Sequence, residues 1–129
     1  MSFVTILTPL FNGIEYFEEC YNSVLGQTCQ EFIWMIGVNG HGDDSNNIYS
    51  LLKHLNSSKI VIKNYDTKGK VDTLNEMMKD ITTPYVCILD VDDIWFPNKL
   101  EVQKLALEKY PFIDVFSTNC HYMGELNHV

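Results

Sequence analysis

Hydrophobic and polar positions along the chain follow two alternating patterns. Runs of apolar and β-branched residues recur, and such runs are typical of strands that helices cover on both faces. Between these runs, apolar residues return every three or four positions, which is typical of helices with one buried side. We therefore expect strands at residues 3–8, 32–38, 60–62, 85–89 and 114–118. The same reasoning predicts helices at residues 14–25, 48–55, 70–81 and 97–110.

The alternation of strands with helices determines the expected fold class. A helix that connects two neighbouring strands makes them parallel, and the connection is right-handed. The 129 residues, 46% of them hydrophobic, are enough for one buried core. We therefore expect a single α/β domain over residues 1–129, with a mainly parallel sheet flanked by helices. Ligands of such sheets bind beyond the carboxyl ends of the strands, so the loops there are the candidate sites.

The charge balance limits the classes of ligand. The chain carries 17 acidic and 9 basic residues, a formal net charge of -8, and every basic residue is a lysine. Arginine would offer forked contacts to phosphates and base edges, and its absence leads us to expect no nucleic-acid partner. A polyanionic ligand would need a local lysine cluster or a metal cation that reverses the sign of the field.

Cysteine spacing and the N-terminus bear on the compartment. The 4 cysteines form no CxxC pair, so we expect reduced thiols that bind no metal. The first residues carry no basic leader, and no apolar run approaches the ~20 residues that span a bilayer. We therefore expect a cytoplasmic protein without a transmembrane segment.

Three aspartates follow the predicted strand at residues 85–89. Asp90, Asp92 and Asp93 stand close together, and their mutual repulsion is costly unless a cation is bound. Carboxylate oxygens suit a hard divalent ion such as Mn²⁺ or Mg²⁺. The alternative is that Asp92 or Asp93 caps the next helix or turn, as aspartate often does. The position at the end of a central strand favours the metal.

A basic segment precedes the predicted helix at residues 70–81. Lys68 and Lys70 flank Gly69 where the first N–H groups of a helix and its dipole also favour an anion. The segment suits a diphosphate; the alternative is a solvated basic turn. No G-x-G-x-x-G follows the first strand and no complete P-loop is present, so dinucleotide and Walker-type binding are not supported.

Several segments in this order resemble family-2 glycosyltransferases of the GT-A fold. They are residues 4–12 (VTILTPLFN), 23–28 (SVLGQT), 69–75 (GKVDTLN) and 88–100 (ILDVDDIWFPNKL). The first is similar to the family's opening strand and Pro-x-(aromatic)-Asn turn. The last is similar to its Asp-x-Asp block, which an aromatic residue, Pro and Lys-Leu follow. The resemblance runs through nearly the whole chain and implies a Rossmann-like nucleotide-diphospho-sugar transferase fold.

This resemblance implies an inverting, metal-dependent enzyme that transfers a sugar from a nucleoside diphosphate donor, most often UDP-linked, to an acceptor. Asp90 would lie near the ribose, and Asp92, together with Asp90, would hold Mn²⁺ or Mg²⁺ on the diphosphate. Phe11 would pack on the base. The expected substrate-binding residues are Pro9, Leu10, Phe11, Asn39, Lys68, Gly69, Lys70, Asn75, Asp90 and Val91.

The sequence departs from the family pattern at two places. The family's second strand usually ends in two aspartates that read the base, whereas Val38 and Asn39 stand here. The Asn39 amide donates as well as accepts, which leaves the choice of base open. The family's catalytic base lies well after the Asp-x-Asp block, and this chain ends at Val129. We therefore expect an apparently truncated domain without that base, which binds donor but alone transfers sugar poorly.

Two functions outside this reading stay open at this point. The chain can be a non-catalytic nucleotide-binding module, or a donor-binding part that another domain or chain completes. Residues 90–94 (DVDDI) also resemble the motif of haloacid dehalogenase phosphatases. The aspartates of that family follow its first strand, so the match is poor. The sequence names neither the sugar nor the acceptor.

Overall fold

The computed structural model describes residues 1–39, 48, 50, 52, 55 and 57–124. Its strands are β1 Val4–Leu10, β2 Phe32–Asn39, β3 Ile60–Tyr65 and β4 Tyr85–Ile88. Its helical segments are the 3-10 turn η1 Ile14–Tyr16 and the α-helices α1 Phe17–Leu25, α3 Lys70–Met78 and α4 Lys99–Lys109. Residues 48, 50 and 52 are helical, while the rest of the helix expected there lies outside the described residues.

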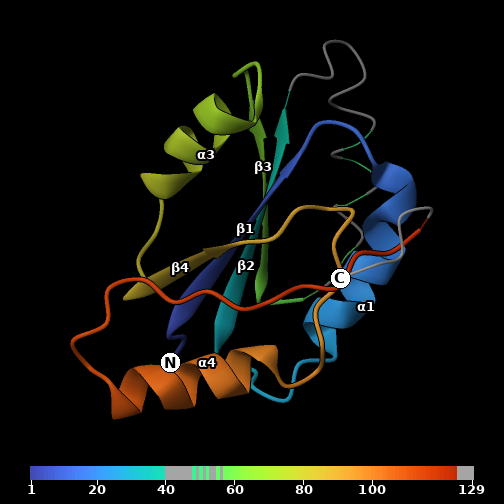
Figure 1. The fold of residues 1–129 in the computed structure, drawn as a ribbon. Helices are drawn as coiled ribbons and strands as arrows, with labels where there is room; N and C mark the ends of the chain where they lie inside the picture. The colour runs from blue at the N-terminus through green and yellow to red at the C-terminus, as the bar shows by residue number, and fades with distance from the viewer. Residues whose placement is uncertain (40–47, 49, 51, 53–54, 56, 125–129) are drawn as a thin grey trace.

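The described strands form one sheet in the order β3-β2-β1-β4, and every pair is parallel. The predicted α/β class and parallel sheet are therefore confirmed. Helices α1 and α3 lie on opposite sides of this sheet, and α4 lies near the N-terminal ends of β1 and β2 (Figure 1). An ion pair of 2.9 Å between Lys104 Nζ of α4 and Glu31 Oε1, just before β2, supports this placement.

The face of the sheet toward α1 holds the larger hydrophobic core. Even-numbered residues of β1 and β2 point to it because successive side chains of a strand alternate between faces. The ring of Phe17 is stacked on that of Trp34 with centroids 5.9 Å apart, and Trp34 Nε1 donates to Thr8 Oγ1 at 2.9 Å. The buried members of this core are Val4, Ile6, Leu10, Phe17, Cys20, Val24, Phe32, Trp34, Ile36, Val38, Leu52, Leu89, Val91 and Leu100.

The opposite face packs on α3 and depends on a missing side chain. Leu7, Met35 and Met77 are buried there together. A Cβ on Gly37 would lie 2.6 Å from the Met77 sulfur, which is closer than such atoms approach. Glycine at this position therefore lets the last turn of α3 lie directly on β2.

Gln27 joins the end of α1 to the start of α4. It is only 3% exposed, and its Nε2 donates to the carbonyls of Ser23 and Phe96 at 3.1 and 2.8 Å. Its Oε1 accepts from the Leu100 N–H at 3.1 Å. That N–H belongs to the first turn of α4, where backbone N–H groups have no acceptor within their own helix. A side chain just after α1 thus caps the start of α4. It also holds the segment that leads from the aspartates to α4, through its bond to the Phe96 carbonyl.

The structure differs from the expected elements at several boundaries. The helix expected at residues 14–25 is divided into η1 and α1, and the one expected at residues 97–110 begins at Lys99. The strand expected at residues 60–62 continues to Tyr65, and the helix expected at residues 70–81 ends at Met78. These shifts leave the order of the elements unchanged.

The strand expected at residues 114–118 is wrong. Residues 115–120 have no regular secondary structure, and Val115 is 85% exposed. A β-strand needs a neighbouring strand for its backbone groups, and in the described part of the chain β4 pairs only with β1. Local sequence records a preference for extended backbone but not the presence of a partner.

No helix among the described residues is long and apolar enough to cross a membrane.

Replacing the Gln27 amide should show whether its hydrogen bonds, and not its burial alone, stabilise the fold. Gln27→Leu leaves the Leu100 N–H without a partner and removes one donor to the Phe96 carbonyl, which still accepts from the Lys99 N–H, so we expect the free energy of unfolding to fall by about 1–3 kcal/mol. The measurement is urea denaturation. Gln103→Leu, the same change at a half-buried position of α4, should stay within about 0.5 kcal/mol. Equal small effects of both variants would contradict the capping role of Gln27.

Candidate functional site

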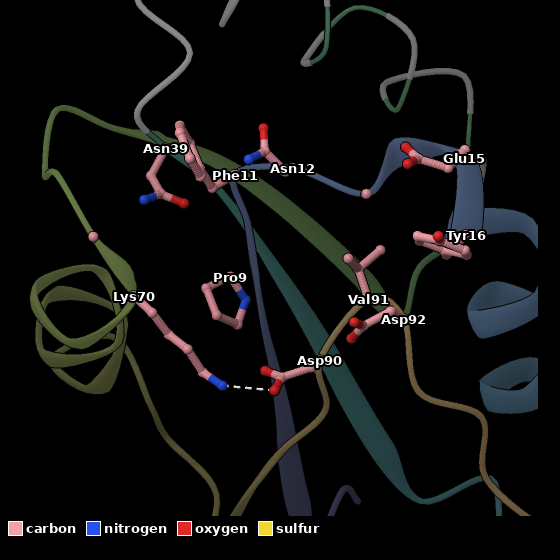
Figure 2. Close-up of a pocket in the computed structure, with 12 residues that line it drawn as sticks. Pro9, Phe11, Asn12, Glu15, Tyr16, Asn39, Lys70, Asp90, Val91 and Asp92 are labelled. Carbon is pink, nitrogen blue, oxygen red and sulfur yellow. Dashed lines mark hydrogen bonds and ion pairs between the residues drawn. The ribbon is translucent and has the colours of Figure 1, made fainter. Parts of the chain in front are cut away.

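A cavity of about 350 Å³ lies at the carboxyl ends of the strands. Figure 2 shows side chains from the ends of β1, β2 and β4 and from the start of α3 around it. Its lining residues are Pro9, Phe11, Asn12, Gly13, Glu15, Tyr16, Asn39, Gly69, Lys70, Asp90, Val91 and Asp92. This is the place where ligands of open parallel sheets bind, as predicted from the order of elements.

Pro9 opens the sheet at this end. The carbonyls of Phe3 and Leu7 accept from the N–H groups of Tyr85 and Leu89, so alternate residues of β1 direct their backbone toward β4. Pro9 is the next residue in that series and has no N–H to donate. The register between β1 and β4 accordingly stops at Leu7 and Ile88. Beyond this last pair of residues the segments that follow β1 and β4 separate, and the cavity lies between them.

A tight backbone contact forms the wall opposite α3. Gly13 has a φ of 94°, a conformation that side chains disfavour. A Cβ at this position would lie 2.9 Å from the Val91 side chain. Val91 is 7% exposed and belongs to the main core. It anchors the loop between Asp90 and Asp92, so the carboxylates on both sides of it point away from the core.

The aspartates form a compact acidic cluster. The Asp93 N–H donates to the Asp90 carbonyl at 3.0 Å and closes a turn, and carboxylate oxygens of Asp90, Asp92 and Asp93 all lie within 4.8 Å of one another. Partial desolvation, then the charges of Asp92 and Asp90, raise the pKa of the Asp93 carboxyl. Oxygen donors at this spacing fit a hard divalent cation such as Mn²⁺ or Mg²⁺.

Lys70 neutralises part of this cluster. Its Nζ donates to Asp90 Oδ2 at 2.6 Å across the cavity (Figure 2). Three carboxylates and one ammonium still leave a formal charge of -2. Gly69 precedes the helix with a φ of 92°, so α3 begins at the cavity and its first N–H groups lie there. A diphosphate therefore meets attraction from α3 and repulsion from the aspartates unless a cation is present.

Asn39 is a buried amide at the far end of the cavity from the aspartates. Its side chain is 0% exposed, and both Oδ1 and Nδ2 lack a hydrogen-bond partner among the described residues. It lies beside Phe11 (Figure 2), whose ring is 49% exposed. A buried amide without partners costs free energy, so this end of the cavity is suited to a flat ligand that both donates and accepts.

The structure brings most of the predicted substrate-binding residues to the cavity, but not all of them. Pro9, Phe11, Asn39, Gly69, Lys70, Asp90, Val91 and the metal candidate Asp92 line it. Leu10 is buried in the core instead, and Lys68 and Asn75 are exposed outside the lining.

The residues predicted for the site did not include Asn12, Gly13, Glu15 and Tyr16, which also line the cavity. The last two were expected in a helix that starts at residue 14, whereas η1 precedes α1 there. The Asn12-Gly13 pair is a turn signal that could have delayed that helix start.

A second cavity of about 830 Å³ adjoins the first and shares Tyr16 and Asp92 with it. Trp95 and Phe96 line it, and Lys99 Nζ lies 5.3 Å from the centre of the Trp95 ring. Lys99 also donates to Thr118 Oγ1 at 2.9 Å, and burial lowers the pKa of its ammonium. Aromatic faces next to the acidic cluster are suited to contact the apolar side of a sugar ring.

A comparison with protein families decides the relationship. The sequence model of glycosyl transferase family 2 matches residues 5–128. The chain belongs to glycosyl transferase family 2. An Escherichia coli relative, the UDP-Glc:alpha-D-GlcNAc-diphosphoundecaprenol beta-1,3-glucosyltransferase WfgD, is 30% identical over 78% of this chain and 39% of its own length. An uncharacterized glycosyltransferase of Rickettsia felis is 29% identical over 85% of this chain and 18% of its own length.

Solved structures confirm the GT-A fold of this family 2 chain. S. aureus TarS 1-349 in complex with UDP superposes with a TM-score of 0.72 at 19% identity, over 86% of this chain and 33% of that one. The mannosyltransferase PcManGT from Pyrobaculum calidifontis, in complex with GDP-Man and Mn²⁺, gives 0.60 at 18% identity, over 72% and 28%. The chain spans between 16% and 43% of the length of the curated relatives it matches.

The acidic cluster of this family 2 domain should respond to removal of one charge. Folding raises the pKa of the Asp93 carboxyl above its ordinary value of 3.8. At a pH well above that value, the ionised carboxylate therefore destabilises the folded state. In the presence of a chelator, Asp93→Asn should therefore raise the stability at pH 7 by a few tenths of a kcal/mol. The gain should shrink as the pH approaches 4, since the wild-type carboxyl then carries its proton. Urea denaturation at both pH values checks it, with Asp66→Asn at an exposed position as control. A loss of stability at pH 7 would favour a capping role.

Proposed function

We propose that this chain is the donor-binding part of an inverting, metal-dependent glycosyltransferase that uses a nucleoside diphosphate sugar, preferably UDP-linked. The observation that carries the proposal is one cavity with two chemically different ends. Asn39 and Phe11 offer an amide and a ring for a base at one end. Lys70, the start of α3 and the aspartates offer a cation-dependent diphosphate site at the other.

Family membership and the relatives support the donor class. WfgD is named as using UDP-Glc, and TarS has been solved with UDP and with UDP-GlcNAc. PcManGT, in contrast, is bound to GDP-Man. The cavity of about 350 Å³ is at the small end of the range for ligand sites. This favours a single-ring base, such as uracil, over a purine.

The aspartates would hold the cation through Asp90 and Asp92, with Asp93 as the third oxygen donor. When bound, Mn²⁺ or Mg²⁺ supplies a Lewis acid that stabilises the charge of the leaving diphosphate. Lys70 bonds to Asp90, and it would turn to a phosphate oxygen when the cation binds that carboxylate. The acceptor would enter from the side of Trp95 and Phe96, so that its hydroxyl attacks opposite the diphosphate and inverts the anomeric carbon.

A donor-binding module without its own turnover is the alternative. Sugar transfer from a labelled donor distinguishes the two, since a module binds the donor but releases no sugar. General-base help to the acceptor is worth about 10²- to 10⁴-fold in rate, and we place no such base among the described residues. The enzyme in which this domain acts would supply it from outside them.

Dependence of binding on a divalent cation tests the proposal directly. UDP should bind at least about tenfold more tightly with Mn²⁺ than with EDTA, because the cation removes the repulsion between diphosphate and carboxylates. Asp92→Ala should abolish this difference and leave the far-ultraviolet circular dichroism unchanged, since Asp92 is exposed at a loop. Isothermal titration calorimetry gives both affinities. Equal affinity in Mn²⁺ and EDTA for the wild-type chain would refute the proposal.

Lys70 should act on the phosphates and not on the base. Lys70→Ala should weaken UDP about three- to tenfold and uridine by less than twofold, because a point charge at a helix start interacts with anions. Lys68→Ala is a matched control, since Lys68 is exposed two residues away and does not line the cavity. Its effect on UDP should be smaller than that of Lys70→Ala. Identical losses for UDP and uridine in Lys70→Ala would contradict the assignment.

A further inference from the structure

We propose that Asn39 makes the base site of this chain accept cytosine as well as uracil, so that UDP and CDP bind with similar affinity. This inference rests on the proposed function, because it assigns the base of the donor to the Asn39 end of the cavity. It concerns the residue at which this chain differs from the aspartate that the family usually carries.

The Asn39 amide is fully buried and lines the cavity, and neither its donor nor its acceptor is satisfied among the described residues. In folded proteins nearly all buried polar side-chain atoms have a partner. A ligand that occupies the cavity is the source of partners that this geometry leaves open.

The amide of Asn39 offers one acceptor oxygen and one donor nitrogen side by side, and a half-turn of the terminal group exchanges their positions. The edge of uracil presents an acceptor oxygen next to a donor N–H. The edge of cytosine presents a donor amine next to an acceptor nitrogen. The Asn39 amide can therefore make two hydrogen bonds to either base, in one orientation or the other.

An aspartate at the same position lacks the donor. An ionised carboxylate only accepts, so it can make one hydrogen bond, to the N–H of uracil or to the amine of cytosine. Its other oxygen would face an acceptor of either base, the carbonyl oxygen of uracil or the ring nitrogen of cytosine, which is repulsive. A carboxylate at residue 39 would thus weaken both bases, whereas the amide suits both.

The amide lies apart from the charged end of the cavity. Figure 2 shows Asn39 next to Phe11, with the Pro9 ring between Asn39 and the Lys70–Asp90 pair. Phe11 is half-exposed in the cavity lining and offers a ring face for stacking, which is tolerant of base type. Hydrogen bonds from residue 39 are then the contacts that depend on the edge of the pyrimidine.

Calorimetry at pH 8 in Mn²⁺ tests the inference with UDP, CDP and pyrophosphate as ligands. For the wild-type chain we expect dissociation constants of UDP and CDP within about threefold of each other. Asn39→Asp should weaken UDP and CDP alike, each by at least about tenfold, since the ionised carboxylate has no donor for the acceptor atom of either base. Asn64→Asp is the matched control, because it adds the same charge at an exposed residue outside the cavity lining. It should leave both affinities unchanged.

A second variant keeps the test decisive should Asn39→Asp fold poorly. Asn39→Ala should weaken UDP and CDP by the same factor, about five- to fiftyfold, and leave pyrophosphate binding unchanged. A wild-type preference of tenfold or more for UDP would overturn the inference while the proposed function stands, and so would an alanine variant that weakens only one base. If neither UDP nor pyrophosphate binds in Mn²⁺, the proposed function itself fails and the inference fails with it.

Discussion

The missing N–H of Pro9 determines where the sheet ends and where the ligand site begins. The ladder between β1 and β4 closes with the bond from Leu89 to the Leu7 carbonyl at 2.9 Å, and the next donor in that direction would be residue 9. Since proline cannot donate, β4 leaves the sheet there, and Asp90 emerges beside β1. A residue with an N–H would extend the ladder and draw the aspartate loop toward β1. The cavity therefore depends on a backbone atom as much as on the side chains that line it.

The position of the aspartate loop is fixed from behind by Gln27 and Val91. Gln27 bonds to the backbone of Phe96 and Leu100, and Val91 is buried against Gly13. Three carboxylates can then remain close together because the loop cannot relax outward without losing these contacts. This gives a structural role to residues 23–28, which in the sequence stood out only through their resemblance to the family. They hold the loop in place from a distance and do not line the cavity.

Much of the fold could be predicted from the sequence because periodicity records burial, and burial decides the elements here. β1 and β2 are buried on both faces and were found as apolar runs. The strand expected at residues 114–118 failed because no local signal reports whether a partner strand exists. In the site, strand-end loops identified Asp90, Asp92 and Lys70, whereas the shared lining by Glu15 and Tyr16 depends on η1, whose separation from α1 the helical spacing did not reveal.

Each end of the cavity carries an unfavourable arrangement of polar groups, for a different physical reason. At Asn39 two buried polar atoms lack partners, which costs on the order of 1–3 kcal/mol for each such group. At the aspartates, like charges lie within 4.8 Å, and the ion pair between Lys70 and Asp90 offsets them in part. Residues that violate the ordinary rules of burial and charge in this way are expected where function requires them. A nucleoside diphosphate that arrives with a divalent cation would relieve both ends at once, because its base and its phosphates are joined. Binding and folding stability would therefore be linked in this domain. Uridine would relieve only the amide, and pyrophosphate with a cation only the carboxylates, so relief of both ends by one ligand requires the base and the diphosphate in one molecule.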